Sequence, residues 1–260
     1  MGIINLTPDS FSHDGLYRET DVVARALAQA LQLITEGADI LDLGAESTRP
    51  GAAEISKEEE ARRLFPVLKE LVSTVEIPIS VDTYKPEIAE KAIEYGASLI
   101  NDIWGLRAPS DPEFRMAKVV AAAGVPVVIM HNKAQADYHD VVKEVIDGLQ
   151  DSINLAVASG IDFQKIIIDP GIGFGKTHHD NLLLLQKLDQ LKVLGRPILL
   201  GTSRKSVIGK TLGLPVEERL EGTIAANVWG VAKGANIVRV HDVKAISRAL
   251  KMCDAISHER

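Results

Sequence analysis

The chain has 260 residues, of which 46% are hydrophobic and 25% charged, so it can bury a large core and suits one barrel domain or two smaller domains. A formal charge of −7 and a pI near 5.5 exclude a nucleic-acid backbone as the main partner, because such proteins usually carry a basic stripe. The single cysteine, Cys253, cannot form an internal disulfide, which favours a reducing cytoplasm. The sequence has no apolar run of about 18 residues and no basic secretory region at its start, so we expect a cytoplasmic protein without a membrane span.

Eight short apolar runs rich in β-branched residues alternate with eight segments of helical periodicity. The predicted strands cover 2–6, 39–44, 77–82, 98–103, 125–130, 165–169, 197–201 and 237–241. The predicted helices follow them in turn, at 21–36, 57–73, 86–95, 111–123, 139–159, 180–192, 217–233 and 243–256. Continuous apolar strands that alternate with amphipathic helices indicate a parallel sheet covered by helices.

Eight such units in about 250 residues favour closure into an α/β fold of the TIM, or (β/α)8, barrel type. An open, doubly wound sheet is the structural alternative. The chain contains no low-complexity segment or linker, so we expect a single domain over residues 1–260. Glycines that precede many strands are predicted to end the preceding helices: Gly37, Gly96, Gly124, Gly160, Gly195 and Gly234.

Polar residues stand at the end of nearly every predicted strand. They include Asn5, Asp42, Asp82, Asn101, His131, Asp169, the run Ser203 to Lys205, Arg239 and His241. In a barrel of this kind the carboxyl ends of the strands meet at one mouth, where such enzymes build their active sites. A single carboxylate at a strand end usually caps the next helix, but capping does not account for polar residues at eight strand ends together.

The segment DPGIGFGKT, at 169–177, resembles a nucleotide-binding loop only superficially. A P-loop needs glycine six residues before its lysine, and that position holds Pro170. The dinucleotide pattern also fails, because Lys176 occupies the place of its last glycine. We therefore exclude ATP and NAD, and expect the glycines to let the backbone pass close to a flat ligand.

Two kinds of ligand group are indicated at the mouth. Asp82, Asn101 and Asp169 could satisfy a ring with alternating donors and acceptors, such as an aminopyrimidinone, although each could instead serve a structural role. The run GTSRKS, at 201–206, with Arg239 and His241, predicts an anion-binding corner after strands seven and eight. Two polar loops, at 5–11 and 46–51, are typical of mobile lids or of ordinary surface turns. The first of them contains Phe11.

Seven blocks of sequence resemble those of the dihydropteroate synthases, a family of pterin-binding enzymes. They are MGIINLTPDSFS (1–12), ESTRPG (46–51), SVDT (80–83), INDI (100–103), DPGIGFGKT (169–177), GTSRKS (201–206) and RVHDV (239–243). The blocks follow in the family's order and span the chain. The resemblance implies a transferase of folate biosynthesis, inhibited by sulfonamides, that condenses a pterin methyl pyrophosphate with p-aminobenzoate and releases pyrophosphate.

Carried over by position, the resemblance assigns residues to each substrate. It implies that the pterin is held by Asp82, Asn101, Asp169 and Lys205, and that the pyrophosphate is met by Asn5, Arg239 and His241. It also implies that Asn5 binds Mg²⁺. The p-aminobenzoate pocket would comprise Thr48, Arg49, Pro50, Ser206 and Phe11. The residues expected to act in catalysis are Asp82, Lys205, Arg239 and Phe11.

Some positions depart from the family pattern. After SFS the family often has Asp-Gly-Gly, whereas this chain has His13, Asp14 and Gly15, which displaces the loop aspartate by one residue. The second loop reads GAES instead of the frequent GGES, and the fifth strand ends in MHN instead of MHM. The resemblance further implies small-molecule substrates, no membrane partner and a homodimer through the later helices.

Three other functions remain open at this stage. A methyltetrahydrofolate-dependent methyltransferase would share Asp82, Asn101 and Asp169 but has no use for the SRKS run. A Schiff-base aldolase would use Lys205 as its amine. A catalytically silent protein would bind pterin without releasing pyrophosphate.

Overall fold

Eight parallel strands form the centre of the computed structural model, which describes residues 1–7, 19–47 and 53–258. The first six lie in chain order in one sheet, and the last two form a pair. Each observed strand falls inside a predicted one. They are β1 (Gly2–Asn5), β2 (Leu41–Gly44), β3 (Ile79–Asp82), β4 (Leu99–Asp102), β5 (Val127–Met130), β6 (Ile166–Asp169), β7 (Leu199–Leu200) and β8 (Ile237–Val238).

Two parallel bridges close these strands into a barrel. Ile168 pairs with Ile198 between β6 and β7, and Gly2 pairs with Val240 between β1 and the end of β8. The amide of Ile3 donates to Val240 O at 3.1 Å, across the joint between the first and last strands. The predicted barrel is therefore confirmed, and the open sheet is excluded.

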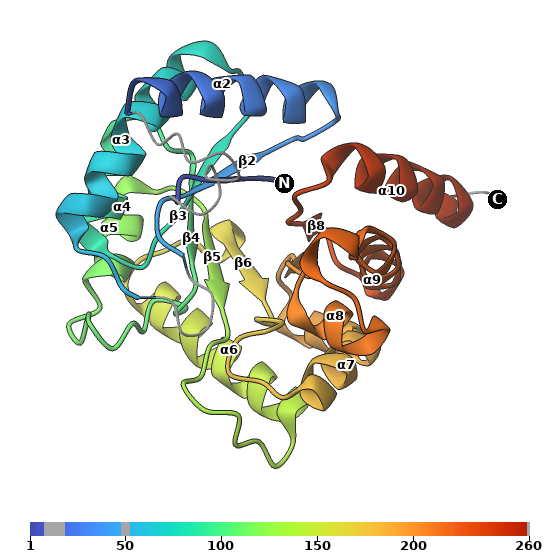
Figure 1. Cartoon of the computed structure of the whole chain (residues 1–260). Coiled ribbons are helices and arrows are strands. Elements are labelled where there is room, and N and C mark those ends of the chain that lie inside the picture. The colour runs from blue at the N-terminus through green and yellow to red at the C-terminus, as the bar shows by residue number, and fades with distance from the viewer. Residues whose placement is uncertain (8–18, 48–52, 259–260) are drawn as a thin grey trace.

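Helices surround the barrel on the outside (Figure 1). They are α2 (Glu19–Thr35), α3 (Lys57–Thr74), α4 (Pro86–Glu94), α5 (Arg115–Ala123), α6 (Val141–Ala158), α7 (His178–Gln186), α8 (Ser206–Leu212), α9 (Leu220–Lys233) and α10 (Val243–His258). Short 3₁₀ turns occupy Phe163–Lys165, Leu188–Leu194 and Val216–Glu218. All six glycines predicted to end helices have positive φ. None of the described helices is long and apolar enough to cross a membrane.

Helix α8 is absent from the sequence-based prediction, which assigned neither a strand nor a helix to residues 202–216. The helix begins at Ser206 and ends before Gly213, whose φ is 71°. Its seven residues are too few for an amphipathic pattern to be recognised. The consequence is that Lys205 and Ser206 lie at the start of a helix, where their backbone is fixed.

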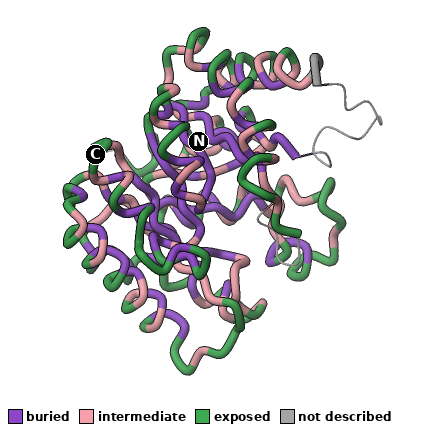
Figure 2. Tube along the Cα trace, turned by 90° about the vertical axis from the view of Figure 1, so that its left-hand side faces the viewer, coloured by how far each residue is buried: buried purple, intermediate pink, exposed green. Residues whose placement is uncertain are grey.

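The period-two alternation of the strands sorts their residues between two layers. Leu41 and Leu43 of β2 belong to the main apolar cluster, packed with the helices, so Asp42 between them faces the interior of the barrel. The same alternation places Ser80 and Asp82 on the interior face of β3, since Ile79 and Val81 also belong to the main apolar cluster. Figure 2 shows the buried residues gathered at the centre of the molecule and the exposed ones around it.

A substitution in α9 tests how tightly the outer layer packs. A methyl group on Gly230 would lie 2.2 Å from Leu200 Cδ2, and Leu200 is fully buried. We expect Gly230→Ala to lower the free energy of unfolding by about 1–3 kcal/mol, measured by urea denaturation. In a Leu200→Val background, which lacks the clashing Cδ2, the same substitution should cost much less. An equal cost in both backgrounds would show that the clash is relieved elsewhere.

Candidate active site

The interior faces of the strands bring the predicted residues to one end of the barrel. The register pairs Asn5 with Gly44 and Gly44 with Asp82, so these three residues form a row across β1, β2 and β3. A methyl group on Gly44 would lie 3.6 Å from Asp82 Cβ and 3.8 Å from Asn5 Oδ1. Because Gly44 has no side chain, the space between the two predicted binding residues, Asn5 and Asp82, stays open.

Arg239 joins two buried carboxylates at the mouth. Its Nε donates to Asp42 Oδ2 at 2.5 Å, and its Nη2 donates to Asp82 Oδ2 at 2.8 Å. Asn101 Nδ2 donates to the same Asp42 oxygen at 3.3 Å. Arg239, predicted for the pyrophosphate, thus directly contacts Asp82, predicted for the pterin, and the two predicted subsites adjoin. The remaining oxygens, Asp42 Oδ1 and Asp82 Oδ1, are buried and have no hydrogen-bond partner among the described residues.

Burial sets the charge properties of this cluster. It raises the pKa of Asp82 to about 7, even though Arg239 favours the ionised form and opposes the shift. Burial also disfavours the charged form of Arg239, but the charges of Asp42 and Asp82 outweigh it and raise the pKa of the guanidinium. Arg239 therefore stays charged, while Asp82 can exchange a proton near neutral pH.

A second group of side chains surrounds Gly201, just after β7. A methyl group on Gly201 would lie 3.6 Å from Lys205 Nζ, 3.9 Å from Asp169 Oδ2 and 4.0 Å from Arg239 Cβ. Burial raises the pKa of Asp169 and lowers that of Lys205 to about 8. The Lys205 ammonium donates to Ile172 O at 2.6 Å. The structure thus brings Asp82, Asp169, Lys205 and Arg239 together, as the sequence predicted.

The glycine-rich segment after β6 packs against backbone, which corrects the expectation that its glycines accommodate a flat ligand. A methyl group would lie 2.0 Å from His131 O at Gly171 and 1.8 Å from Lys133 O at Gly175. Both glycines also have positive φ. The close approach of two chain segments therefore accounts for them, while Gly173 faces Lys205, whose Cδ would lie 3.3 Å from an added methyl group.

Lys176, which sequence analysis considered only for nucleotide binding, ties this segment to the end of β5. Its ammonium donates to Gly171 O and Phe174 O, each at 3.0 Å, and to His131 O at 3.2 Å. It also contacts His131 Nδ1 at 3.2 Å. Burial lowers the pKa of His131 to about 3, so the ring is neutral and can accept from Lys176.

The predicted anion-binding residues after β7 and β8 contact one another. Ser203 Oγ lies 3.0 Å from His241 Nδ1, and the His241 amide donates to Ser203 Oγ at 3.2 Å. Ser206 is exposed at the start of α8. The other predicted p-aminobenzoate residues (Phe11, Thr48, Arg49 and Pro50) and the displaced Asp14 lie outside the described residues.

Sequence reasoning missed three features of the mouth. Asp42 was noted as a strand-end residue but given no role, and its place on the interior face of β2 could have revealed one. Phe174, the aromatic residue of the glycine-rich segment, lies with its ring centroid 4.7 Å from Lys205 Nζ. Asp102 accepts from the amides of Trp104 and Leu106, both at 2.8 Å, so it organises the chain after β4.

A buried ion cluster fixes the chain on both sides of the second loop. Lys85 Nζ contacts Glu46 Oε2 at 2.5 Å and Glu60 Oε2 at 2.6 Å. Glu46 Oε1 accepts from the amide of Ile55 at 3.2 Å and from Tyr84 OH at 3.1 Å. Glu46, which precedes residues 48–52, is therefore bound directly to Ile55, which follows them.

The link between Arg239 and Asp82 predicts a measurable change in acidity. In an Arg239→Gln variant the pKa of Asp82 should rise above its value of about 7, because the neighbouring positive charge is lost. NMR titration of ¹³C-labelled carboxyl groups measures this directly. Asp102 is the internal control: burial raises its pKa to about 6, opposed by the Trp104 and Leu106 amides, and Arg239 is not among the groups that shift it, so its pKa should change less than that of Asp82. An unchanged Asp82 would contradict the proposed coupling.

Known proteins resemble this chain over nearly its full length. The profile of the family described as "pterin binding enzyme" matches residues 1–241. The dihydropteroate synthase of Bacillus subtilis (strain 168) is 50% identical over 256 residues, which cover 98% of this chain and 87% of that protein.

Solved structures are similar over the whole chain. The dihydropteroate synthase of Clostridium difficile, determined in the presence of pteroic acid, has a TM-score of 0.94 and 46% identity, covering 100% of this chain and 96% of that one. The enzyme of Xanthomonas albilineans with 4-aminobenzoic acid has a TM-score of 0.93 and 45% identity, covering 100% and 93%. With both the sequence profile and these relatives matching nearly its full length, the chain belongs to the pterin-binding enzyme family.

Proposed function

We propose that this protein is a transferase that condenses 6-hydroxymethyl-7,8-dihydropterin pyrophosphate with p-aminobenzoate, giving 7,8-dihydropteroate and pyrophosphate in folate biosynthesis. The observation that carries the proposal is the buried Asp82 Oδ1 at the mouth, which has no hydrogen-bond partner among the described residues, with Asn101, Asp169 and Lys205 at the ends of other strands. A buried acceptor without a donor is costly unless a ligand supplies one. The N–H groups of a pterin are donors of the required kind.

The four residues match the edge of a pterin ring in chemical type. Asp82 and Asp169 accept from ring N–H and amino groups, Asn101 can both donate and accept, and the Lys205 ammonium donates to the ring carbonyl. The mouth also holds these groups in a mostly buried setting, where each hydrogen bond is stronger than in water. Their roles follow from this chemistry and from the family resemblance.

The reaction requires departure of pyrophosphate from the pterin methylene. The C–O bond breaks with its electron pair remaining on pyrophosphate, and the electron-rich ring shares the positive charge left on the methylene. The Asp82 carboxylate, close to the ring, stabilises this cation, while Arg239 and His241 stabilise the charge on the leaving group. The aniline nitrogen of p-aminobenzoate then forms the C–N bond and loses a proton. No protein nucleophile is needed for this SN1-like displacement.

Ser206 supports the second substrate site, since it is exposed at the start of α8 beside Lys205. Thr48, Arg49, Pro50 and Phe11 complete the proposed p-aminobenzoate pocket. A sulfonamide, which shares the aniline group of p-aminobenzoate, should compete for it.

The mouth offers a donor that suits Mg²⁺, but only together with oxygens of the substrate. No group of three His, Cys, Asp or Glu side chains in the described part of the chain could hold a metal by itself. Mg²⁺, however, is often bound through one or two protein oxygens together with substrate phosphates, and Asn5 offers an amide oxygen across Gly44 from Asp82. We propose that Asn5 holds Mg²⁺ with the pyrophosphate, where the ion neutralises charge on the leaving group.

A homodimer and a cytoplasmic location complete the proposal. The later helices expose large apolar side chains, which support a protein interface there: Leu182 at 40%, Trp229 at 49%, Met252 at 62% and Ile256 at 66%. The single cysteine supports a reducing compartment. That residues 1–260 form one domain also stays a prediction.

A pyrophosphate-release assay with and without p-aminobenzoate tests the function. We expect release that depends on p-aminobenzoate, abolished in Asp82→Ala because the acceptor and the charge facing the ring are lost. Lys205→Ala should weaken pterin binding, whereas Lys210→Ala, an exposed lysine of the same helix, should not. Pterin binding without pyrophosphate release would instead identify a silent binder, and borohydride trapping at Lys205 an aldolase.

Chelation of Mg²⁺ tests the role of Asn5. It should weaken calorimetric binding of the pterin pyrophosphate more than binding of a pterin without pyrophosphate, because only the former shares the ion with Asn5. Asn5→Ala should reduce this metal dependence. Equal effects of chelation on both ligands would refute the proposed magnesium site.

A further inference from the structure

The turn that follows β7 contains an arginine in a backbone conformation that favours glycine. The amide of Lys205 donates to Thr202 O at 3.1 Å and closes a four-residue turn, whose third residue is Arg204. Arg204 has a φ of 58°, in the left-handed region. Such a conformation costs free energy for a residue with a Cβ and persists only where surrounding contacts enforce it.

Helix α9 holds both backbone groups of this residue. The Arg204 amide donates to Thr223 Oγ1 at 3.1 Å, and Arg219 Nη1 donates to Arg204 O at 2.9 Å. Thr223 Oγ1 in turn donates to Arg219 O at 2.8 Å, and Thr223 is fully buried. Both backbone groups are thereby satisfied, so the strained conformation is determined by helix packing.

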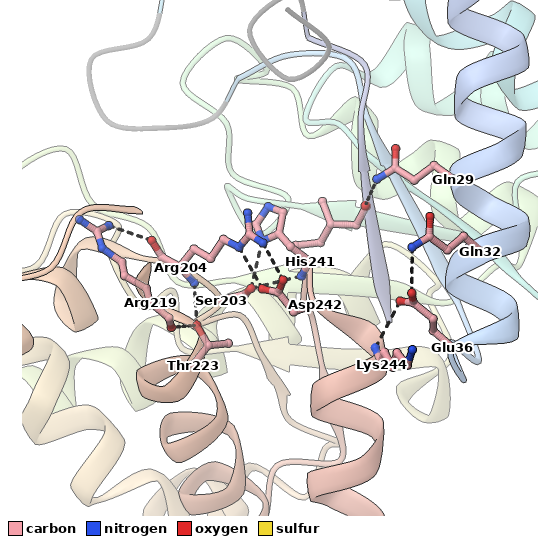
Figure 3. A network of polar contacts seen from close by, with 11 residues as sticks. Gln29, Gln32, Glu36, Ser203, Arg204, Arg219, Thr223, His241, Asp242 and Lys244 are labelled. Carbon is pink, nitrogen blue, oxygen red and sulfur yellow. Dashed lines mark hydrogen bonds and ion pairs between the residues drawn. The ribbon is translucent and has the colours of Figure 1, made fainter. Parts of the chain in front are cut away.

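The side chain of Arg204 reaches across to the end of β8. Its Nε and Nη2 donate to the two oxygens of Asp242 at 2.9 and 2.6 Å. The ion pair is therefore bidentate, and both of its partners are charged. Figure 3 shows this pair beside the contact between Ser203 and His241. Residues 203–204 and 241–242 are therefore joined twice, once by the ion pair and once by the serine and histidine.

One neighbour of Arg204, Lys205, is assigned to the pterin by the proposed function, and the other, Ser203, contacts His241, which is assigned to the pyrophosphate. Lys205 follows Arg204 directly and points its ammonium toward Ile172 O and the region of Asp169. Ser203 precedes it and contacts His241. Any change in the direction of the turn must therefore move Lys205, and any loosening between the two segments must weaken the contact between Ser203 and His241.

We infer that Arg204 is a positioning residue with two separable roles in this site. Its left-handed backbone, held by α9, directs Lys205 toward the pterin. Its ion pair with Asp242 holds Ser203 against His241 and so fixes the corner that receives pyrophosphate. The inference rests on the proposed function for the identity of the two ligands.

Substitution by glycine separates the two roles from each other. Glycine adopts positive φ readily, so Arg204→Gly keeps the turn and loses only the ion pair. Arg204→Ala loses the ion pair and keeps a Cβ at positive φ, whereas Thr223→Val keeps the ion pair and removes the oxygen that accepts from the Arg204 amide, which releases the turn. Asp242→Ala removes the ion pair from the other side and leaves the residue at 204 unchanged.

Calorimetry with a pterin that lacks pyrophosphate, and separately with inorganic pyrophosphate and Mg²⁺, gives the required readout. Arg204→Gly and Asp242→Ala should keep pterin affinity within about twofold and weaken pyrophosphate binding up to about fivefold, the size expected for a partly exposed ion pair of good geometry. Arg204→Ala should behave like these two variants, whereas Thr223→Val should weaken pterin binding.

Gly213→Ala is the matched control for a strained alanine. Gly213 has a φ of 71°, and a methyl group there would meet nothing within 4 Å. It should lower the melting temperature, as a general cost of positive φ, and leave both affinities unchanged. Circular dichroism of all variants should show a folded barrel.

Three outcomes would overturn the inference. Unchanged pterin affinity in Thr223→Val would show that the backbone conformation held by α9 does not direct Lys205. Unchanged pyrophosphate affinity in Arg204→Gly would show that the ion pair does not fix His241. Tighter pyrophosphate binding in Asp242→Ala would show that Arg204 itself binds the anion. If the wild type binds neither ligand, the proposed function fails as well, whereas wild-type binding with unaffected variants overturns this inference alone.

Discussion

The interior of the barrel contains one arginine between two buried carboxylates, and the mouth is arranged around that contact. Removal of one partner from a buried ion pair typically costs about 3–5 kcal/mol, because the other charge remains without compensation. Arg239 therefore cannot move away from Asp42 and Asp82 without a large penalty. A ligand that approaches Asp82 therefore contacts an acceptor whose position is already fixed. The positive charge of Arg239 is also fixed beside that acceptor.

Parallel register converts this contact into a site. Residues that lie far apart in the chain, from Asn5 to Arg239, reach the same end of the barrel because each strand runs in the same direction and alternates its side chains in and out. Asp42 and Asp82 occupy interior positions of β2 and β3, and Arg239 follows β8, which bridges back to β1. Closure of the barrel is thus a condition for the charge cluster, since Arg239 reaches Asp42 and Asp82 only where the last strand returns to the first.

The sequence allowed prediction of the barrel, the helix ends at glycines and the residues that meet at the mouth. Those features depend on local periodicity and on strand direction, both of which are visible in one sequence. It did not allow prediction of α8, whose seven residues carry too short a pattern, or of the contact of Gly171 and Gly175 with the backbone after β5. It also left Asp42 without a role. Contacts between segments distant in the chain depend on packing, and no local pattern encodes them.

Two kinds of order meet in this mouth. The strand ends are fixed by hydrogen bonds and buried ion pairs. Asp82, by contrast, is costly to bury without a ligand. Burial raises its pKa to about 7, and one of its oxygens has no donor among the described residues. A ligand that supplies that donor gains the hydrogen bond and also favours the ionised carboxylate. Ligand binding and ionisation of Asp82 must therefore reinforce each other, so the negative charge needed to stabilise a cation is fully developed when the ring is in place. A barrel with an apolar residue at position 82 would avoid the cost of the buried charge, but its mouth would offer the ring neither an acceptor nor a charge.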